Sequence, residues 1–145
     1  CSLNMNMSIS EIEHEIIEEF GMFENWVEKY DYLIDLGKSI PKINPIYKTD
    51  ENTISGCQSQ VWLHAKCENS VIVFTADSDA IMTKGIVALL IRVLSNQKPE
   101  KILDAKLDFI AKIGLEEQLS QTRATGLSSM IKQMKIYAFA FKEKL

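Results

Sequence analysis

Two short strand-like segments between blocks of helical pattern constrain the fold of this chain most. Residues 61–67 alternate apolar and polar side chains, residues 71–76 are rich in β-branched ones, and Glu68 and Asn69 between them suit a two-residue turn. This pattern predicts an antiparallel hairpin. Because helical segments flank the hairpin on both sides, we expect an α+β fold in which a small antiparallel sheet packs against helices. One face of the first strand is expected to carry Val61, Leu63, Ala65 and Cys67.

Two amphipathic helices are expected before the hairpin. Ser8 and Glu11 have the spacing of a capping box, and the apolar repeat that follows predicts a helix that Gly21 ends or breaks. Gly37 is the expected C-terminal stop of the second helix, and residues 39–48 are expected to form an extended connector without helix. The outer face of the first helix should be acidic, through Glu11, Glu15, Glu18 and Glu19. The second helix should bury Phe23, Trp26, Val27, Tyr30, Leu33 and Ile34.

Helical segments also follow the hairpin. Residues 77–79 are expected to cap a helix over residues 80–94 that is apolar on nearly every side and therefore central. Pro99 should begin a short helix, and another should end at Gly114. Residues 121–144 are expected to form one long helix. Its inward side chains should be Leu127, Met130, Ile131, Met134, Tyr137, Ala138 and Phe141, and its outer ones Lys132, Lys135, Lys142 and Lys144.

Length and charge restrict the function classes. We expect the 145 residues to form a single domain, 1–145, with residues 1–7 as a flexible tail. The longest apolar run, residues 86–91, is far shorter than the roughly 20 residues of a membrane span, and no export signal is visible, so we expect a cytoplasmic protein with free thiols. The net charge of −4 argues against nucleic-acid binding.

The charge is divided between the two halves of the sequence. Residues 1–60 hold 4 Lys or Arg against 11 Asp or Glu, while residues 61–145 hold 12 against 9. This division favours oriented docking onto a protein partner, although two solvated faces would give the same count.

The stretch around Cys57 has the composition of a reactive loop. Gly56 permits a sharp turn before the thiol, and the polar side chains of Gln58, Ser59 and Gln60 suit an irregular turn that leads into the first strand. We therefore expect Cys57 at a loop apex, where a thiol can react. The alternative is a buried cysteine that acts as a small hydrophobic residue.

Several chemistries fit this thiol less well than sulfur exchange. The arrangement of Cys57, His64 and Cys67 matches no common zinc pattern, and His64 and Cys67 should point to opposite faces of the strand, as an exposed histidine and an inward cysteine. A Cys–His hydrolase would need a third residue to orient His64, and none can be identified. No glycine-rich phosphate loop is present, so no cofactor is expected, and the zinc comparison above likewise predicts no metal. A thiolate without an evident base suits attack on sulfur, aided by positive charge from Arg123, Lys84 or a helix N-terminus.

Three sequence blocks resemble one known family. Residues 56–62, GCQSQVW, are similar to the signature of the SufE family, the sulfur acceptors of cysteine desulfurases in iron–sulfur cluster assembly. Residues 77–80, DSDA, followed by Lys84 and Gly85, resemble the second block of that family. Residues 123–127, RATGL, with Met130, resemble the third. The resemblance covers about residues 10–140, and Cys67 is an additional thiol outside its pattern.

The resemblance implies a fold shared with iron–sulfur scaffold proteins and a role in sulfur transfer. Cys57 would take sulfur from a persulfide on a pyridoxal-phosphate desulfurase, stimulate that enzyme and deliver the sulfur to a scaffold, while the desulfurase binds the pyridoxal phosphate. The chain would be a monomer or weak homodimer, enzyme-like in its covalent intermediate but dependent on a partner. The alternative is a non-catalytic binding module with a packed, inert Cys57. The implied site comprises Cys57, loop support from Gly56, Gln58, Ser59 and Gln60, and partner-binding candidates Arg123, Asp77 and Lys84.

Overall fold

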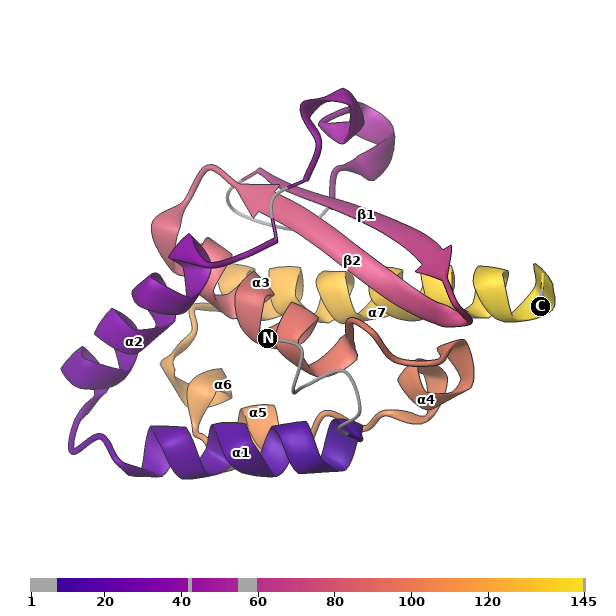
Figure 1. Cartoon of the computed structure of the whole chain (residues 1–145). Helices are drawn as coiled ribbons and strands as arrows, with labels where there is room; N and C mark the ends of the chain where they lie inside the picture. The colour runs from indigo at the N-terminus through magenta and orange to yellow at the C-terminus, as the bar shows by residue number, and fades with distance from the viewer. Residues whose placement is uncertain (1–7, 42, 55–59, 145) are drawn as a thin grey trace.

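A two-stranded antiparallel hairpin lies over a group of helices, as the computed structural model shows (Figure 1). The structure describes residues 8–41, 43–54 and 60–144, so the tail expected at residues 1–7 lies outside the described residues. The architecture confirms the α+β prediction. In chain order the elements are α1 (Ile9–Gly21), α2 (Trp26–Lys38), the 3₁₀ turns η2 (Pro45–Tyr47) and η3 (Asp50–Asn52), β1 (Val61–Glu68), β2 (Val71–Ser78), α3 (Ile81–Leu94), α4 (Pro99–Asp104), α5 (Phe109–Lys112), α6 (Leu115–Gln118) and α7 (Gln121–Lys144).

The hairpin has the predicted faces but a different turn. β1 and β2 pair in the register Val61↔Ser78 through Glu68↔Val71, and side chains of both strands alternate between buried and more exposed positions. The turn consists of Asn69 and Ser70, with φ angles of 53° and 68°, so the expected turn was one residue too early. Two consecutive left-handed residues are what a tight hairpin turn requires, and the twist of the strands selects them.

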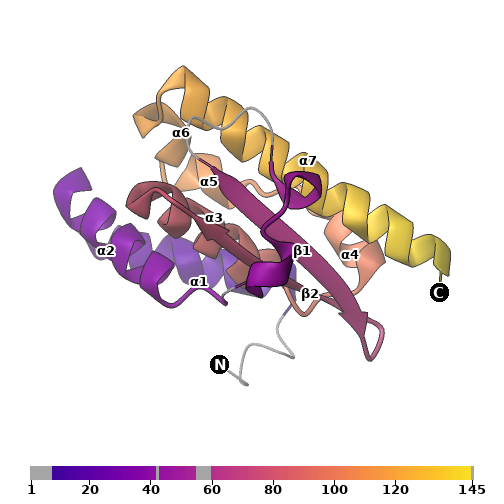
Figure 2. The same cartoon turned by 90° about the horizontal axis from the view of Figure 1, so that it is seen from above.

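Helix α3 lies at the centre of the molecule, as its composition predicts. Nine of its residues are buried, and it packs against α1, α2, α7 and β2. Seen from above, α7 runs along one side of the hairpin in nearly the same direction as β1 (Figure 2). The expected cap at residues 77–79 is wrong, because β2 continues through Ser78 and the N-cap residue, Ala80, has no side-chain cap.

The two N-terminal helices confirm the capping box and correct two details. The side chains of Ser8 and Glu11 each accept a hydrogen bond from the other residue's backbone N–H, and α1 ends at Gly21. Val27 is 71% exposed although it was expected in the core. It lies six residues before the fully buried Leu33, which places it about 120° around the helix from the inward face. Gly37 is buried inside α2 rather than beyond its end, because α2 continues to Lys38.

The remaining segments follow the predictions with three exceptions. The connector expected to lack helix contains η2, which Pro45 begins and Asn44 caps. The short helix α6 was not predicted. Lys135, expected outside, is half-buried, and its Nζ donates to the carbonyl oxygen of Ala105 at 2.6 Å. The long helix α7 has the predicted bounds, and no helix in the described ranges is long and apolar enough to cross a membrane.

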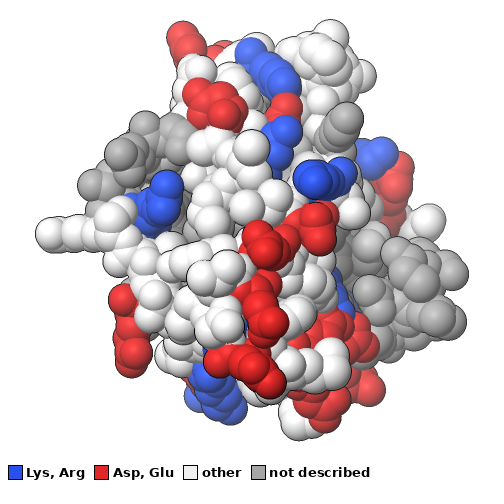
Figure 3. All heavy atoms as spheres, turned by 90° about the vertical axis from the view of Figure 1, so that its left-hand side faces the viewer, with Lys and Arg blue, Asp and Glu red and all other residues white. Residues whose placement is uncertain are grey.

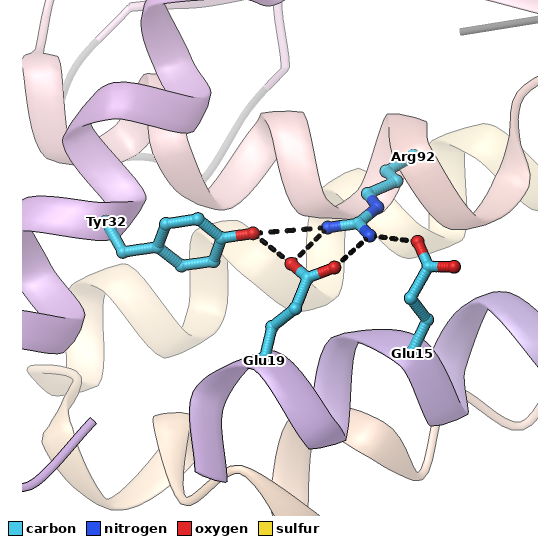
Figure 4. Close-up of polar contacts among 4 residues, drawn as sticks. All are labelled: Glu15, Glu19, Tyr32 and Arg92. Carbon is cyan, nitrogen blue, oxygen red and sulfur yellow. Dashed lines mark hydrogen bonds and ion pairs between the residues drawn. The ribbon is translucent and has the colours of Figure 1, made fainter. Parts of the chain in front are cut away.

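A largely buried arginine joins the first three helices (Figure 4). The guanidinium of Arg92 on α3 donates to both carboxylate oxygens of Glu19 on α1, at 2.8 and 2.6 Å, and also to Glu15. The hydroxyl of Tyr32 on α2 donates to Glu19 as well. The side chain of Arg92 is only 17% exposed. Glu15 and Glu19 were expected on a solvated face, and the structure shows instead that they anchor α1 to α3.

Replacing Glu19 with glutamine is expected to lower the unfolding free energy by about 1–3 kcal/mol at pH 7, because Arg92 loses its charged partner. The hydrogen bonds from Arg92 lower the pKa of Glu19 below its ordinary value of 4.5. The ionised carboxylate therefore stabilises the fold above that value and ceases to do so as the pH falls through the lowered pKa. Urea unfolding should show the difference between wild type and variant shrinking below about pH 4.

The matched control is Glu18→Gln. Glu18 is 70% exposed and pairs with His14 within the same helix at 3.0 Å, so its loss should change stability by less than about 0.5 kcal/mol. A Glu19→Gln defect that is equally large at pH 3 and pH 7 would contradict the ion pair as its cause.

Candidate functional site

The residues on either side of the predicted reactive loop are fixed to the hairpin. Gly56, Cys57, Gln58 and Ser59 lie outside the described residues, but the residues that flank them do not. The N–H of Ile54 donates to the carbonyl oxygen of Val61 at 2.9 Å, and Thr53 forms a β-bridge with Trp62. Backbone hydrogen bonds of this kind place Ile54 against the beginning of β1.

Gln60 is bound to the end of β2 through its backbone. Its N–H donates to Oδ1 of Asp79 at 3.1 Å, and its carbonyl oxygen accepts from the hydroxyl of Ser78 at 2.8 Å and from the N–H of Asp79 at 3.3 Å. Ser78 is buried. Ile54 and Gln60 therefore both lie at the end of the hairpin where β1 begins, and residues 55–59 connect them.

Asp77 binds two lysines next to this point. It is the cross-strand neighbour of Trp62, and its carboxylate oxygens lie 2.6 Å from Nζ of Lys48 and 3.2 Å from Nζ of Lys84. Burial alone would raise the pKa of Asp77, but hydrogen bonds from Lys48, from the N–H of Ser78 and from Lys84 outweigh it and lower the pKa. Asp77 is therefore ionised at neutral pH. Nζ of Lys48 also lies 5.0 Å from the ring centroid of Trp62, in cation–π contact.

Arg123 lies in the first turn of α7 and is exposed. Because α7 runs in the same direction as β1, its first turn is at the end of the molecule where β1 begins (Figures 1 and 2). Within the described ranges, none of the ion pairs involves its guanidinium. The structure thus brings Gln60, Asp77 and Lys84 together and places Arg123 toward the same end.

Both signs of charge are present at this end, because Asp79 as well as Asp77 lies beside the basic side chains. Lys48 and Lys84 share the single carboxylate of Asp77, each with a side chain 34% exposed. Arg123 adds a further positive charge toward the same end. A positive charge close to a thiol favours the thiolate, and Lys48, Lys84 and Arg123 are the basic side chains placed toward this end. Acidic side chains gather across the middle and lower part of the face in Figure 3, which shows the side of the molecule where α2 lies in Figure 1.

The imidazole of His64 on β1 packs against another aromatic ring. His64 stacks on Tyr47, with ring centroids 3.6 Å apart and planes 10° from parallel. It was expected to be exposed and is half-buried instead; burial, and then the charge of Lys66, lower its pKa. Cys67 is a free, half-buried thiol. Among the side chains that the structure describes, no group of three or more His, Cys, Asp or Glu could hold a metal ion.

Three residues of this end were not part of the site predicted from the sequence. Lys48 reaches Asp77 only because the chain folds back over the hairpin. Ser78 and Asp79 belong to the second sequence block, but they were expected to cap a helix and instead hold Gln60. For Ser78 and Asp79, the available sequence signal was that they belong to the second block of the resemblance.

Comparison with known proteins identifies relatives over most of the chain. The family model SufE, described as an Fe-S metabolism associated domain, matches residues 14–138. A SufE-like protein of Rhizobium meliloti (strain 1021), itself uncharacterised, is 41% identical over 83% of this chain and 90% of its own length. The SufE-like protein 1, chloroplastic/mitochondrial, of Arabidopsis thaliana is 37% identical over 90% of this chain, which spans 35% of that longer protein. The solution structure of a hypothetical protein from Thermus thermophilus has the same fold, with a TM-score of 0.74, 20% identity and coverage of 89% of this chain and 94% of its own.

Proposed function

The chain belongs to the SufE family, which is associated with iron–sulfur metabolism, and we propose that it carries sulfur on Cys57. The donor is a persulfide on a pyridoxal-phosphate-dependent cysteine desulfurase, which this chain also stimulates. The acceptor is an iron–sulfur cluster scaffold. The pyridoxal phosphate belongs to the desulfurase, and the chain itself needs no cofactor for the transfer.

The transfer step requires no net oxidation or reduction. The Cys57 thiolate attacks the terminal sulfur of the donor persulfide, a new S–S bond forms at Cys57, and the donor's own S–S bond breaks. The donor cysteine leaves as a thiolate and takes up the proton that Cys57 released. Lys48, Lys84 and Arg123 are the basic side chains that support this step, because both the attacking and the leaving sulfur carry negative charge.

One observation carries the proposal for Cys57. The residues immediately before and after its loop, Ile54 and Gln60, are hydrogen-bonded to the hairpin at the same end. Both ends of residues 55–59 are therefore held at one end of the hairpin, and this supports a docking reaction there, which needs reacting groups brought to a defined place. We further propose a cytoplasmic location and a monomer or weak homodimer, which suit free thiols and a transient partner.

The test mixes the purified chain with a cysteine desulfurase and L-cysteine, and measures alanine release and the intact mass of the chain. We expect faster alanine release and a mass gain of one sulfur atom at Cys57, which a thiol reductant removes. In the alternative function, a binding module with an inert Cys57, the chain gains no sulfur. An unchanged mass together with unstimulated alanine release would overturn the proposal.

Arg123→Ala is expected to slow sulfur transfer at sub-saturating desulfurase by about 10-fold, because a planar guanidinium suits bidentate contact with a partner carboxylate. Its stability should change by less than about 0.5 kcal/mol, since Arg123 is exposed. Transfer rates over a range of desulfurase concentrations provide the measurement. The matched control is Lys132→Ala, another exposed cation of α7, and equal rates for both variants would remove Arg123 from the docking surface.

A further inference from the structure

The segment that leads into the Cys57 loop folds over the outer face of the hairpin. This arm, residues 43–54, contains both 3₁₀ turns. Internal bonds hold it: Oδ1 of Asn44 accepts from the N–H of Ile46 at 3.1 Å, and Nδ2 of Asn52 donates to the carbonyl oxygen of Tyr47 at 2.8 Å. The two turns therefore behave as one unit, and its last residue, Ile54, directly precedes residues 55–59.

Aromatic stacking holds the middle of the arm to β1. The Tyr47 ring lies on the His64 ring almost in parallel, at 3.6 Å. His64 is on the outer face of β1, opposite Thr75 of β2. Two flat rings in face-to-face contact fix both the distance and the tilt of the arm relative to the strand.

Two polar contacts hold the arm to other elements. Lys48 reaches across to Asp77 of β2 at 2.6 Å and covers the ring of Trp62. The hydroxyl of Tyr137 on α7 donates to Oδ1 of Asn52 at 3.3 Å. The arm is thus attached to both strands of the hairpin and to α7.

From these contacts we infer that Tyr47 and Asn52 are positioning residues for the Cys57 loop. They precede Cys57 by ten and five residues, so they act through the placement of Ile54, while the bonds of Ser78 and Asp79 fix Gln60 at the other end. The expected effect on desulfurase-dependent sulfur uptake rests on the proposed function. The effect on the reactivity of Cys57 does not, because it is measured without a desulfurase.

The test compares Tyr47→Ala with Tyr47→Phe, Asn52→Ala and Tyr137→Phe. Site-resolved mass spectrometry measures the alkylation rate of Cys57 relative to that of Cys67 in the free protein, and desulfurase-dependent sulfur uptake is measured separately. We expect Tyr47→Ala and Asn52→Ala to change the alkylation ratio severalfold, and to lower the uptake rate by about 10-fold because a misplaced reacting group reacts more slowly. Tyr47→Phe keeps the stacked ring and should retain wild-type values, and Tyr137→Phe should reproduce the Asn52→Ala change in weaker form.

The matched control is Tyr30→Ala, which removes a half-buried aromatic ring that packs on Trp26 of α2, away from the arm. It should leave the alkylation ratio unchanged even if it lowers the melting temperature. An unchanged alkylation ratio in both Tyr47→Ala and Asn52→Ala would overturn the inference. Failure of wild-type protein to take up sulfur, with altered alkylation in these variants, would overturn the proposed function and leave the positioning role standing.

Discussion

Cys57→Ser is expected to abolish sulfur acceptance, the largest functional effect of any single substitution in this chain. A serine oxygen cannot take the place of the sulfur in a persulfide, and its hydroxyl ionises far less readily than a thiol. The variant should show no mass gain after incubation with desulfurase and L-cysteine, and it should not accelerate alanine release through repeated turnover. Its unfolding transition should match that of wild type, which would show that sulfur acceptance is lost through the missing thiol and not through unfolding.

Cys67→Ser is the matched control for that experiment. Cys67 pairs with Ile72 near the far end of the hairpin, roughly 23 Å along β1 from Gln60. It is half-buried and lies too far from the anchored loop ends to share their donor. Cys67→Ser and removal of Cys1 should therefore leave sulfur uptake intact, and a folded Cys67→Ser protein that no longer takes up sulfur would show that Cys57 is not the single acceptor.

Gly85→Ala is expected to produce the largest loss of stability. A Cβ at Gly85 would overlap the carbonyl oxygen of Leu33 and lie 2.7 Å from its carbonyl carbon. Because the obstacle is backbone, α2 and α3 would have to separate. Overpacking of this kind costs about 1–3 kcal/mol or more, which exceeds the roughly 1 kcal/mol that alanine gains over glycine within a helix. Urea unfolding should show a lower midpoint, and Gly85→Val should fail to fold.

Gly21→Ala is the matched control, since nothing lies within 4 Å of a Cβ at that position. It should be neutral or slightly stabilising. Wild-type stability in Gly85→Ala would mean that α2 and α3 are not in such close contact in solution. The same contact explains Gly37, where a Cβ would lie 2.9 Å from the backbone nitrogen of Gly85. Both glycines thus allow two helices to touch, and the position of Lys84 beside Asp77 depends on that approach.

Local sequence patterns were sufficient to predict most of the helices and strands. The capping box of Ser8 and Glu11, the alternation along β1 and the bounds of α7 follow from interactions between residues near in sequence, which periodicity and capping rules describe. The turn of the hairpin was misplaced by one residue because Glu68 and Asn69 both suit a turn, and only the register of the paired strands decides between them. The cap expected at residues 77–79 failed for a similar reason, since pairing with β1 extends β2 over residues that also suit a helix start.

What the sequence by itself determined was the α+β class and the order of the helices around one hairpin, while the reactive loop at Cys57 stays a prediction. The tertiary structure alone decided which charged and aromatic side chains meet. Three such contacts are those of Glu19 with Arg92, Asp77 with Lys48, and Tyr47 with His64. In each pair the two residues are well separated along the chain. A periodic pattern reports which face of an element is apolar, but it carries no information on which other element covers that face. These contacts depend on the packing of α1, α3, the arm and the hairpin against one another, and therefore appear only once the chain is folded.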